Sequence, residues 1–295
     1  MKKKTINKLV IERIILLVPL LLYGIYKNGF LLYKSGIINM VNVFKPLYLT
    51  IFGVIIKVIV DLIFDKINKE KFKIKIDENL LYVILVSLIM PYNINYLIYI
   101  LLLIIILPVL KYLNKYIKFN KVCFIYIIII LINGLINNFS FLNTLELTKN
   151  YEYTLIDYLF GRNIGGISST SIILSLISYI LLSYNFYYKK EIPFYINISY
   201  IICAFIYFLI FKDSDFLINS ELIFGSIFIS SLNEFSPVEE KYQSIYAISI
   251  GVFSFLLSII LSSIVSIYII TFLISCLFYI DFNKLKNNKK ANKDN

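Results

Sequence analysis

The sequence contains no histidine and no tryptophan among its 295 residues, and it has only three cysteines. Without histidine, the chain cannot supply imidazole ligands to haem or metal ions, nor a histidine base for Ser-His-Asp or Cys-His catalysis. Cys123, Cys203 and Cys276 lie far apart in separate apolar runs, which favours packing roles over an iron–sulfur site. We therefore predict no catalytic residue and no metal ligand in this chain.

Charged residues are also scarce. They make up 16% of the chain, whereas 59% of the residues are hydrophobic and the mean hydropathy is +0.81. Ordinary soluble domains have about 25% charged residues and about 45–50% apolar ones, so this composition excludes that class. Because one membrane span needs about 20 apolar residues, a chain of this length with short loops has room for roughly ten spans.

The apolar runs predict an all-α, polytopic membrane protein with about ten transmembrane helices in two halves of five. The spans are expected at residues 9–26, 46–64, 79–92, 95–110, 122–137, 168–187, 193–211, 219–233, 244–260 and 262–280. The corresponding divisions are a first half at 1–137, an outer loop at 138–167, a second half at 168–281 and a basic cytoplasmic tail at 282–295. The third, fifth and eighth spans are short, which is typical of broken helices beside a binding site.

The distribution of basic residues predicts the topology. With the N-terminus inside, 21 of the 29 Lys and Arg residues fall on the cytoplasmic side. The positive-inside rule then places both termini in the cytoplasm, for a multi-pass protein of a bacterial cytoplasmic membrane. The opposite face receives fewer basic residues, among them Lys27 and Lys45, and acidic residues such as Glu221. We interpret the net charge of +11 as this topology signal; the expected environment is the lipid bilayer, and no nucleic acid partner is expected.

One segment combines glycines with hydroxyl groups at the predicted mouth of the sixth span. It contains Gly165, Gly166, Ser168, Ser169, Thr170 and Ser171. Consecutive glycines allow the backbone to approach a ligand closely, and hydroxyls beside free amides suit a phosphate or the polar edge of a ring. The alternative interpretation is a helix N-cap that follows a flexible loop.

Three other places interrupt the apolar pattern. Residues 219–243, which include Ser236 before a proline, indicate either a helix that stops part-way through the membrane or a cytoplasmic turn. Met90-Pro91 predicts a break at the end of the third span. Lys57 and Asp61 are four residues apart, on one helical face, and favour either a structural ion pair or a cation pathway.

Taken in order, these segments resemble the RnfD membrane component of the Rnf electron-transport complex, which is akin to the NqrB component of the sodium-translocating NADH:quinone reductase. The resemblance covers roughly residues 79–260 and is carried by Met90-Pro91, Phe119-Asn120, Asn143-Thr144-Leu145, Gly165 to Ser171 and Phe228 to Val238. It implies a membrane subunit of an ion-motive complex of the ferredoxin:NAD oxidoreductase type, with the other subunits of that complex as partners. Two alternatives stay open: a stand-alone small-solute permease, and a cofactor-free structural subunit of the same complex.

The same resemblance implies FMN or riboflavin as cofactor. The implied cofactor-binding residues are Thr144, Gly165, Gly166, Ser168, Ser169, Thr170, Ser171 and Ser236. Thr144 aligns with the threonine that carries covalent flavin in the related subunits, but Leu142-Asn143 precedes it where the family has Gly-Ala. We therefore predict that covalent attachment is absent or inefficient, and that any flavin is held noncovalently near Gly165 to Ser171.

Overall fold

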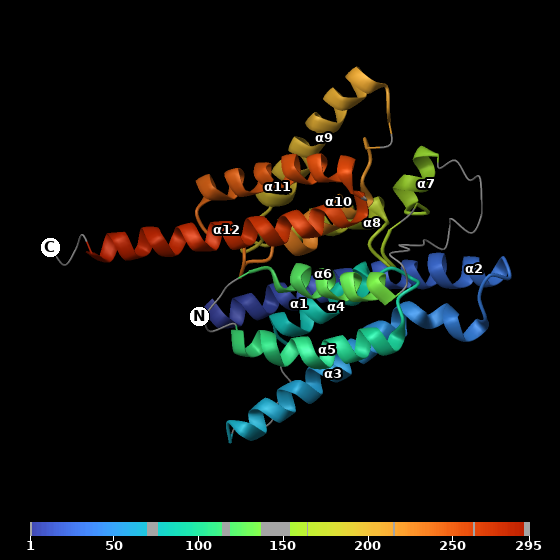
Figure 1. Ribbon diagram of the computed structural model, residues 1–295, viewed down its shortest axis with the longest axis horizontal. Coiled ribbons are helices and arrows are strands. Elements are labelled where there is room, and N and C mark those ends of the chain that lie inside the picture. The colour runs from blue at the N-terminus through green and yellow to red at the C-terminus, as the bar shows by residue number, and fades with distance from the viewer. Residues whose placement is uncertain are drawn as a thin grey trace.

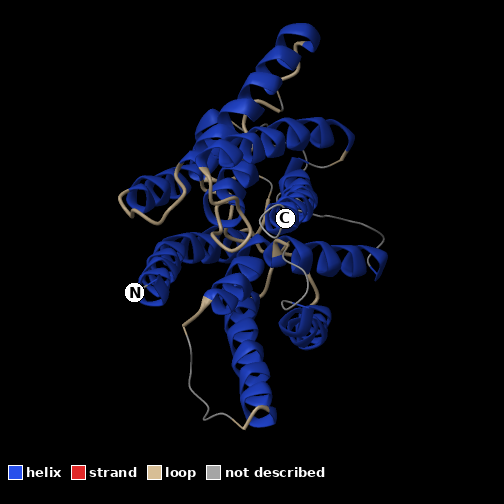
Figure 2. Cartoon of the chain, turned by 90° about the vertical axis from the view of Figure 1, so that its left-hand side faces the viewer, coloured by secondary structure: helices blue, strands red, loops and turns tan. Residues whose placement is uncertain are grey.

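The apolar runs of the sequence coincide with helices in the computed structural model, which describes residues 2–69, 76–113, 119–136, 154–163, 165–214, 216–261 and 263–291. The first half contains α1 (Lys2–Ile25), η1 (Tyr26–Phe30), α2 (Leu31–Lys34), η2 (Met40–Phe44), α3 (Lys45–Ile67), α4 (Glu78–Ile89), α5 (Tyr96–Leu113) and α6 (Lys121–Ile136). After α7 (Leu155–Phe160), the second half contains α8 (Ile172–Ser183), α9 (Glu191–Phe211), α10 (Ser220–Gly225), η3 (Ser226–Ser230), α11 (Glu240–Ile260) and α12 (Ser263–Ala291). The all-α prediction is confirmed, since the described residues contain only helices, turns and loops (Figure 2).

Four helical stretches within the described residues are long and apolar enough to cross a membrane. They are Lys8–Lys34, Met40–Ile67, Glu191–Phe211 and Glu240–Ile260. Six shorter apolar helices, of 10–17 residues, accompany them: α4, α5, α6, α8, α10 with η3, and most of the apolar part of α12. The outer sides of the long and the short helices carry half-exposed large side chains such as Leu62 on α3, Leu101 on α5 and Phe205 on α9. Such continuous apolar surface is stable against lipid and unfavourable in water.

The chain enters and leaves the helical bundle at the same end. Figure 1 shows the start of α1 and the end of α12 on one side, with α2 and α7 on the other. We call these the terminal end and the α7 end. Viewed from the terminal end, α3 and α9 project from the bundle in opposite directions (Figure 2).

The two halves repeat one pattern of helix neighbours. In the first half α3 contacts α5, α4 contacts α6 and α1 contacts α4; in the second half α9 contacts α11, α10 contacts α12 and α8 contacts α10. Tyr82, near the start of α4, bonds Glu234, which lies beyond the end of η3. Residues 166–169 contact the end of α4 and the start of α10. The short helices α4 and α10–η3 therefore run in opposite directions. The sequence alone had not revealed this repetition.

Local chemistry explains where the short helices begin and end. Asp77 and Asn219 accept the backbone N–H groups of Leu80 and Leu222, which caps the starts of α4 and α10. At the end of α4, Met90 adopts an extended conformation with ψ 146°, as expected for a residue that precedes proline. The predicted break at Met90-Pro91 is therefore confirmed.

Several helix boundaries differ from the predicted segment boundaries. Residues 282–291 were expected to be a separate basic tail, but they continue α12, because nothing in the stretch before Ala291 breaks a helix. The sixth span begins at Ile172 instead of 168, since Ser171 caps α8 by accepting the N–H of Leu174. The expected outer loop 138–167 contains the helix α7, in which Thr154 and Asp157 form a capping box.

Candidate functional site

The glycine and hydroxyl segment packs between helices from both halves of the chain. The N–H groups of Ile167 and Ser168 donate to the carbonyls of Met90 and Leu88, each at 2.9 Å. These bonds satisfy carbonyl groups that the end of α4 leaves without helical partners. A Cβ atom on Gly166 would lie 2.7 Å from the carbonyl oxygen of Ile89, so glycine is needed here for contact between two backbones.

Most hydroxyls of this segment bond to protein groups. Ser169 donates to Glu221 Oε1 at 2.6 Å, and Thr170 donates to the Gly161 carbonyl at 2.8 Å. The structure thus brings the predicted residues 165–171 together, but it turns them toward α10 and α1. Ser168 Oγ and the nearby Asn163 Oδ1 are buried and have no hydrogen-bond partner among the described residues.

Glu221 lies at the centre of this arrangement, and its side chain is 1% exposed. Its Oε1 accepts from the Gly166 N–H at 2.7 Å and from Ser169, and its Oε2 accepts from the Tyr268 hydroxyl. The charge count assigned Glu221 to the membrane face opposite the termini, and the structure buries its side chain inside the bundle. The reason is that α10 starts at Ser220 and carries the carboxyl group into the bundle, where three donors surround it.

Lys27 is the basic counterpart of Glu221, and the charge count assigned it to the same membrane face. The first helix continues past Ile25 through η1, which buries the Lys27 side chain. Lys27 Nζ donates to the Asn163 carbonyl at 2.6 Å and to Thr170 Oγ1 at 2.9 Å. Its charge acts on Glu221 through space. We call Lys27, Gly166, Ser169, Thr170, Glu221 and Tyr268 the distal centre.

Lys45 was counted on the same face as Lys27. It begins α3 and is buried. Its ammonium group donates to the Ile94 carbonyl at 2.8 Å and lies over the rings of Tyr92 and Tyr96. The neutral partners and the two ring faces stabilise the charge in this apolar setting.

A second group of charges lies at the other end of α10–η3, toward the terminal end of the bundle. Glu234 accepts from Lys121 Nζ at 3.1 Å and from the Tyr82 hydroxyl. Tyr82 is also within 3.3 Å of Glu78 Oε2. We call Tyr82, Lys121 and Glu234 the proximal centre.

Two further cations surround the end of η3. Arg13, on α1, is 2% exposed and donates to both the carbonyl and the hydroxyl of Ser231, at 3.1 and 3.2 Å. Lys189 donates to the carbonyl and the hydroxyl of Ser236, at 2.8 and 2.7 Å. Positive charge at the end of a helix is favourable because free carbonyls make that end negative. Ser236 is therefore separated from residues 165–171, which lie at the opposite end of α10–η3.

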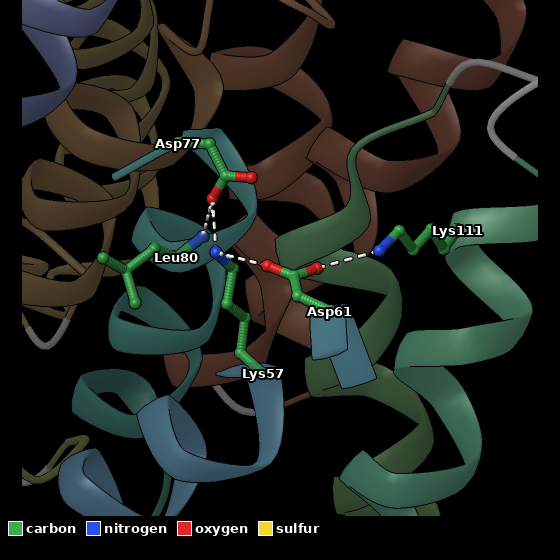
Figure 3. A network of polar contacts seen from close by, with 5 residues as sticks. All are labelled: Lys57, Asp61, Asp77, Leu80 and Lys111. Carbon is green, nitrogen blue, oxygen red and sulfur yellow. Dashed lines mark hydrogen bonds and ion pairs between the residues drawn. The ribbon is translucent and has the colours of Figure 1, made fainter. Parts of the chain in front are cut away.

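The predicted ion pair between Lys57 and Asp61 is confirmed and belongs to a larger network. Lys57 Nζ lies 2.8 Å from Asp61 and 2.9 Å from Asp77, and Lys111 Nζ lies 2.9 Å from Asp61 (Figure 3). A small cavity of about 30 Å³ connects this network with the proximal centre, and that volume suffices for one or two water molecules. Its polar lining consists of Lys57, Asp61, Asn79, Tyr82, Lys111 and Lys121.

Both centres share one composition: a carboxyl group, a tyrosine hydroxyl and a lysine, placed at opposite ends of one short helix. Sequence reasoning did not identify Lys27, Arg13 or Tyr268 as functional candidates. The available signal for Arg13 and Lys27 was their position: Arg13 lies inside the first predicted span, and Lys27 directly follows it. Thr144, the aligned flavin acceptor, lies outside the described residues.

These features define a polytopic α-helical membrane protein with charged groups buried at the ends of short helices. A family model described as the NQR2, RnfD, RnfE family matches residues 1–278. The chain therefore belongs to this family of membrane subunits of ion-translocating redox complexes. A search among curated proteins found no match.

Proposed function

We propose that the protein is a membrane subunit of an ion-motive complex of the ferredoxin:NAD oxidoreductase type, and that the distal and proximal centres lie on its ion path. The observation that carries this proposal is the short helix α10–η3, which has a buried carboxyl group, Glu221, near one end and an ion-paired, partly exposed carboxyl group, Glu234, beyond the other. A charged group in the middle of a membrane helix costs roughly 2.5–3.5 kcal/mol even on insertion scales. Charges retained at that cost are expected to have a function.

The proposal is tested in membranes of the host. Deleting the gene should abolish ferredoxin-dependent reduction of NAD together with the membrane potential that it generates, and a tagged copy should restore both. The tagged chain should also purify together with other membrane subunits. If the chain purifies alone and its deletion leaves electron transfer intact, the stand-alone permease is the better description.

Orientation is part of the proposal: both termini are assigned to the cytoplasm of a bacterial cell, with ten spans between them. In a cysteine-free background, a single cysteine replacing Asn150 should react with an impermeant maleimide in intact cells. A cysteine replacing Asn287 should react only after lysis, because the basic residues around it hold that face inside. Equal labelling of both positions would contradict the assignment.

Flavin dependence is proposed from the family alone. The segment 165–171 does not form a cradle for a flavin ring, because Ser169 and Thr170 are bonded to protein groups and a Cβ on Gly165 or Gly166 would collide with neighbouring residues. Ser236 is likewise bonded to Lys189. The residues present do not fit the ring at this segment, so no step of the proposed function is assigned to flavin there.

A direct measurement tests the cofactor. On a denaturing gel, protein made in its own host with the flavin-attaching enzyme should show little fluorescence, because the motif before Thr144 is altered. The visible spectrum of the native complex reports noncovalent flavin separately. A bright band that disappears in Thr144→Ala would refute the predicted lack of attachment.

A further inference from the structure

The short helix α7 has one apolar side that faces outward. Ile156, Leu159 and Phe160 are spaced at three and four residues, which places them on one side of the helix, and they are 63%, 36% and 52% exposed. We call these three residues the α7 face. The polar Asp157 of the same helix is buried instead. This is the reverse of the pattern of a helix that packs on a protein core and faces water.

The direction of the α7 face is fixed by both ends of the helix. Thr154 and Asp157 form the capping box at its start. At its end Gly161 has a φ of 83°, and the Arg162 N–H donates to the Asp157 carbonyl at 2.7 Å. A Cβ atom on Gly161 would lie 2.6 Å from the backbone of Ser171, so the end of α7 touches the start of α8. The helix therefore lies at the end of the bundle, beyond the first turn of α8 (Figure 1).

The surroundings of α7 have the composition of a boundary between membrane and water. Arg162 follows the helix directly, and its side chain is 51% exposed. Its charge acts through space on the hydroxyl of Tyr23, whose ring lies 6.2 Å from that of Tyr26 near the end of the first predicted span. Tyrosines collect at membrane–water boundaries, and the long side chain of arginine can reach lipid phosphates from apolar surroundings. The helix α8, which α7 contacts, also exposes apolar side chains such as Ile177.

The size of the α7 face favours lipid over a protein partner. Three partly exposed side chains of this kind present roughly 300 Å². A stable protein–protein contact buries about 800 Å² on each partner. A helix that lies on a membrane needs an apolar side and a nearby cation for the lipid phosphates. The α7 face and Arg162 meet both conditions.

We propose that α7 is an interfacial helix that attaches this end of the bundle to the membrane surface. The α7 face inserts among the upper parts of the acyl chains, and Arg162 binds lipid phosphate. The inference goes beyond the proposed function and does not depend on electron transfer.

This attachment also supports the distal centre. The residues that follow α7 supply two of its acceptors: the Gly161 carbonyl accepts from Thr170, and the Asn163 carbonyl accepts from Lys27. Because α7 ends at Gly161, a helix fixed on the membrane holds both carbonyls in place. Contact with lipid therefore contributes to the geometry of the distal centre.

The absence of tryptophan from the chain allows a direct test, since one introduced tryptophan is then the only source of indole fluorescence. Phe160→Trp in the full chain is reconstituted into vesicles of phosphatidylcholine and phosphatidylglycerol whose acyl chains carry bromine near the head group. We expect bromine to quench its fluorescence about as strongly as that of Phe205→Trp, which is on the outer side of α9. Tyr158→Trp is the matched control: it lies two residues away, on the opposite side of α7, and should be quenched less.

Aqueous iodide separates the other outcomes. If iodide quenches Phe160→Trp and brominated lipid does not, the α7 face lies in water. If neither quenches it, protein covers the face, from this chain or from another copy. Either result would overturn the proposal. Adding Arg162→Gln to Phe160→Trp should weaken quenching by brominated lipid, whereas Arg162→Lys, which keeps the charge, should retain it.

Hydrogen exchange tests the effect on the distal centre in the same vesicles. A double variant with Ile156→Gln and Leu159→Gln should exchange the backbone amides of residues 155–163 faster than the unmodified chain does, because α7 then leaves the lipid. Ile177→Gln, on the outer side of α8, is the control and should leave these amides unchanged. Unchanged exchange in the double variant would show that lipid contact of α7 does not support the distal centre.

Discussion

The distal and proximal centres contain the same three kinds of side chain, but they hold their charges differently. Glu221 is enclosed and is bonded to neutral donors, with Lys27 acting from farther away. Glu234 forms a direct ion pair with Lys121, and its side chain is 18% exposed. The distal centre therefore depends on the backbone and hydroxyls of one loop, whereas the proximal centre depends on ion pairs beside a cavity.

The largest expected effect comes from removing the distal cation. Lys27→Met should destabilise the protein by about 2–5 kcal/mol, because it leaves the buried Asn163 carbonyl and Thr170 hydroxyl without the ammonium group that donates to them. The same substitution at Lys111, whose side chain is 31% exposed, should cost no more than about 1 kcal/mol. Thermal unfolding in detergent measures both variants. Equal losses of stability in the two variants would show that Lys27 is no more important to the folded state than the partly exposed Lys111.

A smaller effect is expected where α1 touches the distal loop. A Cβ atom on Gly24 would collide with Ser168 Oγ and lie 2.7 Å from the Ile167 carbonyl oxygen, so Gly24→Ala should cost about 1–3 kcal/mol. Gly225→Ala is the matched control, because its new Cβ would meet only side-chain atoms among the described residues, the nearest at 3.1 Å. Unfolding temperatures compare the two variants. A harmless Gly24→Ala would mean that the loop is free to move away from α1.

The smallest effect concerns pH and the segment between α8 and α9. Burial, together with the neighbouring charge of Arg13, lowers the pKa of Lys189 to about 8 from its ordinary value of 10.5. The unfolded chain then binds more protons than the folded one above pH 8, so stability should rise with pH, by about 1 kcal/mol between pH 8 and 9. Lys189→Met should remove this rise. An unchanged pH dependence in that variant would place the titration elsewhere.

The sequence predicted those features that are encoded locally. Apolar runs located the helices, Pro91 located the end of α4, and the spacing of Lys57 and Asp61 predicted their ion pair. Each depends on residues a few positions apart, whose geometry is that of a single helix.

The two centres depend on long-range contacts and were not foreseen. Lys27 finds its acceptors 136 and 143 residues away, and Arg13 bonds Ser231 across 218 residues. A charge count does not identify such contacts, because it reports only the side of the membrane on which a charge lies. Only the three-dimensional structure shows that Lys27 and Arg13 each have hydrogen-bond acceptors inside the bundle.

Within the described residues, two π-helical turns lie beside the charges of the two centres: η1 contains Lys27, and η3 joins the helix that begins near Glu221 to the segment that holds Glu234. A π turn accommodates one residue more than an α turn, so each behaves as a single-residue insertion. Deleting Ile227 would leave an intact α-helix but rotate everything beyond it by about 100° relative to α10. Ser231 would then face away from Arg13. The presence of one extra residue in the π turn, whatever its identity, therefore determines whether both ends of this helix face their partners.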